Sequence, residues 1–131
     1  MPAISDLDQL LRSLSPRLFE PEFVFCTVPG QLADYLSLNP VATFLEPEGL
    51  TLVLEKSAAL QAGLAFDSTF RQITLQVHSS LEAVGLTAAV ATQLTKAGIS
   101  ANVIAAYHHD HVFVPDDKAD AALAALQQLS A

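Results

Sequence analysis

The chain has 131 residues, of which 51% are hydrophobic and 15% charged, a composition typical of one compact domain or of two very small ones that share a core. The formal net charge is −8 and the six basic residues are scattered singly, which argues against binding to nucleic acid or to an anionic membrane surface. No apolar run approaches the roughly 20 residues of a membrane span, and the first residues lack the features of a secretory signal. A cytoplasmic location is therefore expected.

The first half of the chain predicts mixed helices and strands. We expect a helix over residues 7–14, followed by two short strands over 17–20 and 23–28. One or two helical turns over 31–38 come next, then a hairpin with strands 41–45 and 50–55, and a helix over 56–62. Ser5 or Asp6 can cap the first helix, and Gly63 ends the last one. Pro21 is expected to separate the two strands. Cys26, the single cysteine, is expected to be a buried strand residue.

The second half has a clearer pattern. We expect a strand over residues 70–78 and a helix over 82–97. Two strands over 100–107 and 111–114, joined by a short turn, and a last helix from 115 onward complete this half. Apolar and polar residues alternate along the first of these strands, as in a half-buried strand. Leu86, Val90 and Leu94 recur at four-residue spacing, which predicts an amphipathic helix that ends at Gly98.

The order of these elements predicts the fold class. The second half runs strand, helix, strand, strand, helix, and one strand borrowed from elsewhere would complete the ferredoxin-like βαββαβ plan. The first half repeats this order more loosely. We therefore expect an α+β protein of two half-repeats, residues 1–65 and 66–131, with an antiparallel sheet and helices on one face. The open face of such an apolar sheet would need cover.

Several stretches carry a resemblance to a known family. Residues 73–90 and 97–105 resemble an ACT domain, and residues 48–54 and 109–115 are similar to further markers of short bacterial proteins of unassigned function with two ACT-like halves. The resemblance covers most of residues 16–129. It implies a stand-alone regulatory module that binds a small ligand, most simply an amino acid, as a homodimer. Because the chain has no room for a catalytic domain, an effector would be a separate protein.

The resemblance also places Gly85 where an ACT domain has the glycine near the start of its first helix. A helix N-terminus offers free N–H groups and a positive dipole end, which suit a carboxylate. The alternative is that Ser80 caps the helix and Gly85 allows close packing on the sheet. Asp110 is expected to pair with a ligand ammonium, with Glu48 approaching from the first half. The candidate ligand-binding residues are Ser79, Ser80, Glu82, Val84, Gly85, Leu86, Asp110 and Glu48.

A histidine cluster leaves further alternatives open. His108, His109 and His111 lie around Asp110, and these residue types bind metals. Consecutive strand residues point to opposite faces, however, so one run supplies four ligands only awkwardly. Three interpretations stay open for this cluster: a metal site, a ligand-contacting turn or a solvated hairpin. Of these, the metal site is not the one we expect, and we expect no cofactor.

Catalysis is not expected. The acid pair Glu46 and Glu48 lies in a hairpin turn, where carboxylates are usually just solvated, and the chain contains no nucleophile–base arrangement, phosphate loop or dinucleotide fingerprint. We therefore predict no catalytic residues. A protein-interaction module without a working ligand pocket is the alternative to a ligand sensor.

Overall fold

The computed structural model describes residues 3–130 and divides into two compact units. Residues 3–20 and 71–130 form the terminal unit, and residues 21–70 form the inserted unit. Strand β1 (Pro16–Val28) is shared, because its first residues belong to the terminal unit and its last to the inserted one. Met1, Pro2 and Ala131, the ends of the two expected halves, lie outside the described residues. The expected division near residue 65 stays a prediction about the sequence repeat.

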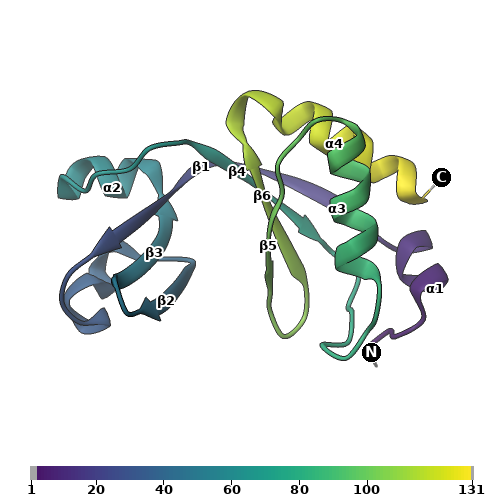
Figure 1. Ribbon diagram of the computed structural model, residues 1–131, viewed down its shortest axis with the longest axis horizontal. Coiled ribbons are helices and arrows are strands. Elements are labelled where there is room, and N and C mark those ends of the chain that lie inside the picture. The colour runs from purple at the N-terminus through teal and green to yellow at the C-terminus, as the bar shows by residue number, and fades with distance from the viewer. Residues whose placement is uncertain (1–2, 131) are drawn as a thin grey trace. The chain divides into compact units, whose positions relative to one another are not determined.

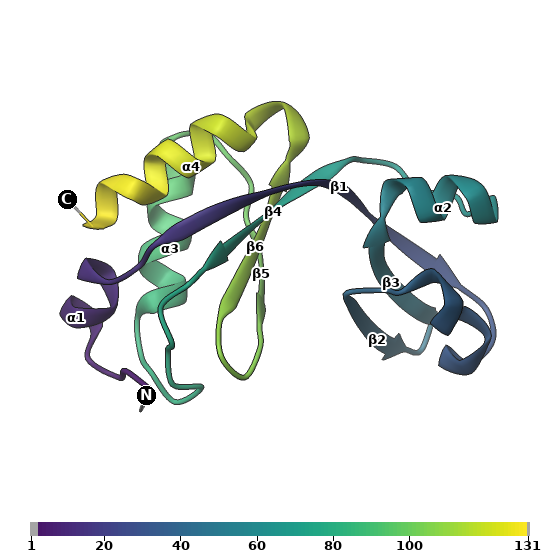
Figure 2. The same cartoon turned by 180° about the vertical axis from the view of Figure 1, so that it is seen from behind.

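The terminal unit is built from helices on one face of a sheet. Its elements are α1 (Leu7–Arg12), the start of β1, β4 (Phe70–Leu75), α3 (Leu86–Lys96), β5 (Asn102–Ala105), β6 (Asp110–Pro115), α4 (Ala119–Gln127) and the 3₁₀ turns η2 (Asp116–Lys118) and η3 (Gln128–Ser130). The strand order is β1–β4–β6–β5, in which β1 is the borrowed strand of the expected ferredoxin-like plan. Helices α3 and α4 lie side by side on the sheet in Figures 1 and 2.

The four-residue spacing in α3 correctly predicted the buried face of this helix. Leu86, Val90 and Leu94 are all buried and pack with side chains of β4, β6 and α4 in one core. Helix α1 adds Leu10 to this core, and Leu14 joins it from just beyond Arg12, where the helix ends two residues earlier than predicted. As expected, the Asp6 side chain caps α1 by accepting a hydrogen bond from the Gln9 N–H at 3.0 Å.

The inserted unit has its own core and contains one end of a six-stranded sheet. Its elements are η1 (Leu32–Leu38), β2 (Ala42–Glu46), β3 (Gly49–Glu55) and α2 (Lys56–Ala62). The order of the whole sheet is β2–β3–β1–β4–β6–β5, and β3 pairs antiparallel with both β2 and β1. Helix α2, visible beside β3 in Figure 2, ends at Gly63 with a φ of +70°, as the sequence predicted. Cys26 is buried in this core, and burial raises the pKa of its thiol.

Two of the expected strands are in fact one. Strand β1 runs continuously through Pro21, where the sequence predicted a break. The reason is that Pro21 stands where β1 passes from one unit to the other, and pairing with β3 begins at Phe23. The missing proline N–H therefore removes no hydrogen bond from the β1–β3 ladder. Within residues 3–130, no helix is long and apolar enough to cross a membrane.

Candidate functional site

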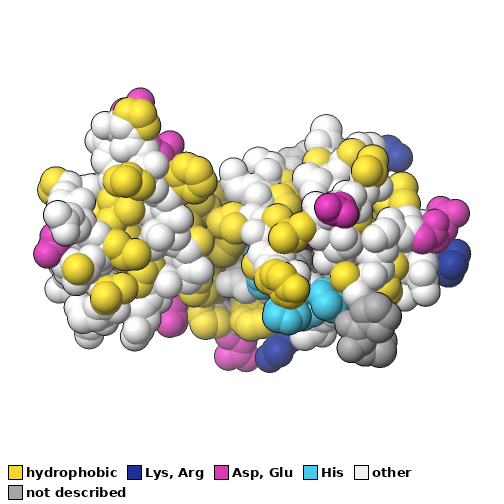
Figure 3. Space-filling model, turned by 90° about the horizontal axis from the view of Figure 1, so that it is seen from below, with side chains coloured by type: hydrophobic (Ala, Val, Ile, Leu, Met, Phe, Trp, Pro, Cys, Tyr) yellow, Lys and Arg dark blue, Asp and Glu magenta, His cyan; other side chains and the backbone are white. Residues whose placement is uncertain are grey.

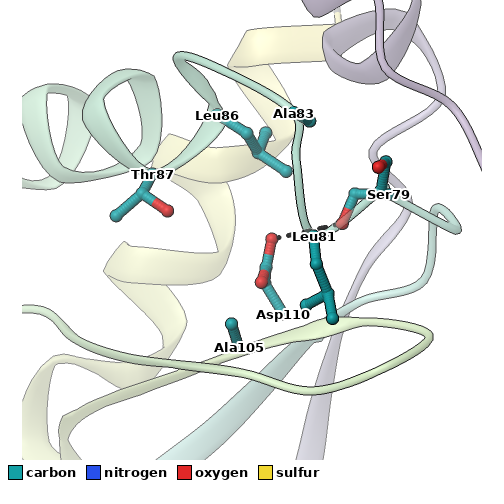
Figure 4. Close-up of a pocket in the computed structure, with 8 residues that line it drawn as sticks. Ser79, Leu81, Ala83, Leu86, Thr87, Ala105 and Asp110 are labelled. Atoms are coloured by element: carbon teal, nitrogen blue, oxygen red, sulfur yellow. Dashed lines mark hydrogen bonds between the residues drawn. The ribbon is translucent and has the colours of Figure 1, made fainter.

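A small pocket opens at the end of the terminal unit where α3 begins. Its volume is about 80 Å³. The pocket lies between the loop that follows β4, the first turn of α3 and the facing ends of β5 and β6 (Figure 4). Its lining residues are Ser79, Ser80, Leu81, Ala83, Leu86, Thr87, Ala105 and Asp110.

The loop on one side of this pocket is held in place by the N-terminal segment. Ile4 pairs with the loop like a short parallel strand next to Ser79. Its N–H donates to the carbonyl oxygen of His78 at 2.8 Å, and its own carbonyl accepts from the N–H of Ser80 at 2.9 Å. Ser79 itself is 6% exposed. The backbone of the two serines is therefore fixed by a residue about 75 positions away in the chain.

The expected helix start at Glu82 is wrong, because the loop continues to Gly85. The N–H groups of Glu82 and Ala83 bond to the hydroxyl and the carbonyl of Ser80, at 3.1 and 3.0 Å, and so form a turn. Ser80 therefore caps this turn and not the helix. Helix α3 begins at Leu86, with Gly85 as the residue before it.

Gly85 gives the helix start its shape. Its φ is +100°, in the region that favours glycine, and its carbonyl accepts the N–H of Ala89 at 2.9 Å. A Cβ at this position would lie 3.0 Å from Cδ2 of Leu7, so α1 packs closely against the helix start. Because Gly85 has no side chain, no capping side chain covers the first N–H groups of α3. These groups begin at Leu86 and Thr87, which both line the pocket.

Asp110 brings a carboxylate to the same pocket from β6. It is half-buried, and the hydroxyl of Ser79 donates to its Oδ2 at 3.4 Å. Figure 4 shows the carboxylate directed toward Ser79, across the pocket from α3. Among the eight lining residues, which all lie in the described part of the chain, Asp110 carries the one charge. Ser79, Ser80 and Thr87 add hydroxyl groups.

The structure thus groups part of the predicted set. The pocket is lined by Ser79, Ser80, Leu86 and Asp110 of this set, and Gly85 is the residue directly before Leu86 in the chain. Glu82 and Val84 are exposed on the loop, and Glu48 belongs to the β2–β3 turn of the inserted unit; none of them lines the pocket. Sequence reasoning did not include four lining residues. Leu81, Ala83 and Thr87 are sequence neighbours of chosen residues, whereas no local signal identifies Ala105.

The histidines around Asp110 contact different neighbours. His111 is half-buried, with its Nδ1 2.9 Å from Oγ1 of Thr74, whereas Nδ1 of His109 lies 3.1 Å from the carbonyl oxygen of Val77. Burial, and then the neighbouring His109, lower the pKa of His111, while Asp110 acts in the opposite direction. The Nδ1 atoms of these two histidines therefore have different partners.

His108 makes ring contacts instead. Its ring centroid lies 5.2 Å from that of His78 and 5.0 Å from that of Tyr107, and imidazole rings reach the surface together in Figure 3. Among residues 3–130, no group of three or more His, Cys, Asp or Glu side chains is placed to hold a metal ion. The structure thus gives no support to the metal-site alternative.

The chain is similar to known proteins over nearly its whole length. Residues 2–71 and 67–128 each match a family profile described as ACT domain. A Vibrio cholerae protein of unknown function, described as a possible transport protein, is 61% identical over 95% of this chain and 96% of its own, with a TM-score of 0.88. No curated protein matches the chain.

More distant structures share the fold. The ligand-free regulatory subunit of aspartate kinase from Thermus thermophilus is 13% identical over 89% of this chain and 98% of its own, with a TM-score of 0.60. A protein from Agrobacterium tumefaciens is also 13% identical, over 88% of this chain and 87% of its own, with a TM-score of 0.68. The α+β fold of the structure, an antiparallel sheet with helices, agrees with both profile matches. The chain belongs to the ACT domain family.

Proposed function

We propose that the protein is a non-catalytic regulatory module that binds an amino acid, or a similar small zwitterion, in the pocket at the start of α3. The observation that carries the proposal is the pairing of two opposite electrostatic features around one small cavity. The uncapped N-terminus of α3 lies on one side, and the Asp110 carboxylate lies on the other. Cytoplasmic location and action on a separate effector protein belong to the same proposal.

The start of α3 supplies the site for the ligand carboxylate. The helix has 11 residues, and its backbone dipole leaves a partial positive charge at this end. The first N–H groups have no capping side chain, so they are donors in need of an acceptor. An incoming carboxylate meets both requirements, as anions generally do at helix N-termini.

Asp110 supplies the site for the ligand ammonium. Its Oδ2 accepts one long hydrogen bond from Ser79, which leaves capacity for a charged donor. An ammonium has three N–H donors, and the hydroxyl oxygens of Ser80 and Thr87 line the same cavity as further acceptors. A ligand with a single charge satisfies one side of the pocket and opposes the other, whereas a zwitterion satisfies both.

The test is a titration of the full chain with each of the common amino acids, followed by thermal unfolding and calorimetry. A ligand at about 100 times its Kd stabilises the folded state by about 2.7 kcal/mol, which is readily measured. Loss of one charge-assisted contact removes about 1.5–3 kcal/mol of binding energy, so Asp110→Asn should weaken binding about tenfold or more without unfolding the protein.

The matched control is Asp67→Asn, which removes the same charge from an exposed loop of the inserted unit. This variant should bind as the unmodified protein does. If no amino acid or related zwitterion changes the stability, the proposed function is wrong. If a ligand binds but Asp110→Asn leaves its affinity unchanged, the ligand occupies a different site.

A further inference from the structure

We infer that the ligand of this pocket is a neutral amino acid with a short side chain, and that Ala105 limits the size of that side chain. The inference rests on the proposed function and adds a ligand class to it. It follows from the charge of the lining, from the volume of the cavity and from the residues that form its apolar wall.

The charge of the lining excludes ionised side chains. The ligand ammonium uses the carboxylate of Asp110, which is the one charged group among the eight lining residues. A basic side chain would bring a second cation without a second carboxylate. An acidic side chain would place a second anion beside Asp110 without a cation to balance it.

Basic side chains of the terminal unit are engaged elsewhere. Arg71 donates to the carbonyl oxygen of Phe19 and lies 3.9 Å from Asp116, and Lys118 donates to the carbonyl oxygen of Gly98. Arg17 lies over the ring of Phe19, and Lys96 stands in the last turn of α3, at the opposite end of the helix from the pocket. None of these four lines the cavity, and neither does Arg12 in the last turn of α1 or any histidine, so the lining contains no basic group to compensate an acidic ligand.

The volume limits the ligand to a small molecule. About 80 Å³ is roughly a quarter of the ~300 Å³ at which sites for drug-sized ligands begin. The carboxylate and the ammonium of an amino acid fill much of this space. A hydrogen, methyl or hydroxymethyl substituent fits in what remains. A longer chain would extend beyond this space, where the lining residue Leu81, 65% exposed, gives it little cover from water.

The apolar wall identifies the residue that sets this limit. Ala83, Leu86 and Ala105 present hydrocarbon to the cavity, and in Figure 4 the methyl group of Ala105 points into it from the end of β5. Because Ala105 is exposed and lies outside the buried core, a larger residue there fills the pocket without disturbing the fold. We therefore assign Ala105 as the residue that determines the accepted side-chain size.

The experiment compares five probes by calorimetry on the full chain: glycine, alanine, leucine, aspartate and lysine. Alanine or glycine should bind at least tenfold more tightly than the other three. Aspartate or lysine binding as tightly as alanine would overturn the charge argument, and leucine binding as tightly would overturn the size argument. Both of these results leave the proposed function standing. If none of the five probes binds, the ligand class assigned here is wrong.

Two variants then test the role of Ala105. Ala105→Val should weaken alanine binding at least tenfold and glycine binding much less, so that the ratio of the two affinities changes. Ala106→Val adds the same groups at the next exposed position, which does not line the pocket, and should leave the ratio unchanged. A general loss of folding would reduce both affinities together. An unchanged ratio in Ala105→Val would show that Ala105 does not set the size limit.

Discussion

Replacement of Gly85 by alanine tests how the start of α3 is built. Gly85 has a φ of +100° and a ψ of −16°, which L-residues rarely adopt. Backbone strain of this kind costs of the order of 1–3 kcal/mol. The added Cβ would also lie 3.0 Å from Cδ2 of Leu7, closer than ordinary contact, so the end of that side chain has to move by a few tenths of an ångström. We expect Gly85→Ala to reduce the free energy of unfolding by about 2–4 kcal/mol, with most of the loss from the backbone.

The same helix provides the control. Gly98 lies beyond the other end of α3 with a φ of +73°, and a Cβ there meets no described heavy atom within 4 Å. Gly98→Ala therefore has backbone strain without the steric contact. Its φ also lies nearer than that of Gly85 to the common left-handed region, so the strain is smaller. It should destabilise by about 1 kcal/mol. Urea unfolding measures the free energy of unfolding of both variants, and the two values can be compared directly if the m-values are equal.

A second substitution separates backbone strain from crowding. Truncation of Leu7 to alanine removes the atoms that the new Cβ meets, so the effects of Leu7→Ala and Gly85→Ala should be less than additive. If Gly85→Ala destabilises no more than Gly98→Ala, and its effect adds fully to that of Leu7→Ala, then α1 does not pack against the helix start as described.

Three further predictions follow from the two units. Leu126, which is fully buried in the core under α4, should lose about 2–5 kcal/mol of stability on replacement by alanine, as measured by chemical denaturation; an unchanged midpoint contradicts the assigned helix face. Burial lowers the pKa of His111 below the usual value of about 6.5, so the unfolded chain binds the proton more readily. The stability present above about pH 6.5 should then fall as the pH decreases through the lowered pKa, and His111→Asn should flatten this profile. The protein should be a dimer by light scattering at tens of micromolar, because Phe44 and Leu45 are 71% and 77% exposed on β2, the edge strand of the inserted unit; a monomeric mass, or dimers that persist in Phe44→Lys, would contradict this.

Local patterns predicted the elements whose limits depend on local interactions. The hairpin of β2 and β3 turns at Pro47 and Glu48, as its turn residues indicated. Helix α2 ends at Gly63, where the left-handed conformation suits glycine. The order of the second half also identified the ferredoxin-like plan with a borrowed strand, although the sequence did not indicate that β1 provides it.

The errors occur where distant segments decide the local structure. Glu82 and Ala83 are good helix formers, so sequence propensity extends α3 toward the N-terminus by a turn. In the structure backbone hydrogen bonds tie Ile4 to His78 and Ser80, and the chain continues as a turn after Ser80 instead of beginning the helix. Similarly, Pro21 reads as a strand breaker until the change of partner strand is known.

The same distinction explains which part of the candidate site was predictable. Asp110 was chosen for its carboxylate, and Gly85 was placed by the resemblance to an ACT domain, although the helix itself was predicted to begin at Glu82. The shape of the cavity depends on three segments that meet: the loop fixed by Ile4, the first turn of α3 and the end of β5. Ala105 enters the lining only through the pairing of β5 with β6, which sets Ala105 opposite Asp110. Because that pairing places Ala105, the proposed size limit, beside Asp110, the proposed partner of the ammonium, a substitution at position 105 should alter the choice of ligand side chain more than the requirement for a zwitterion.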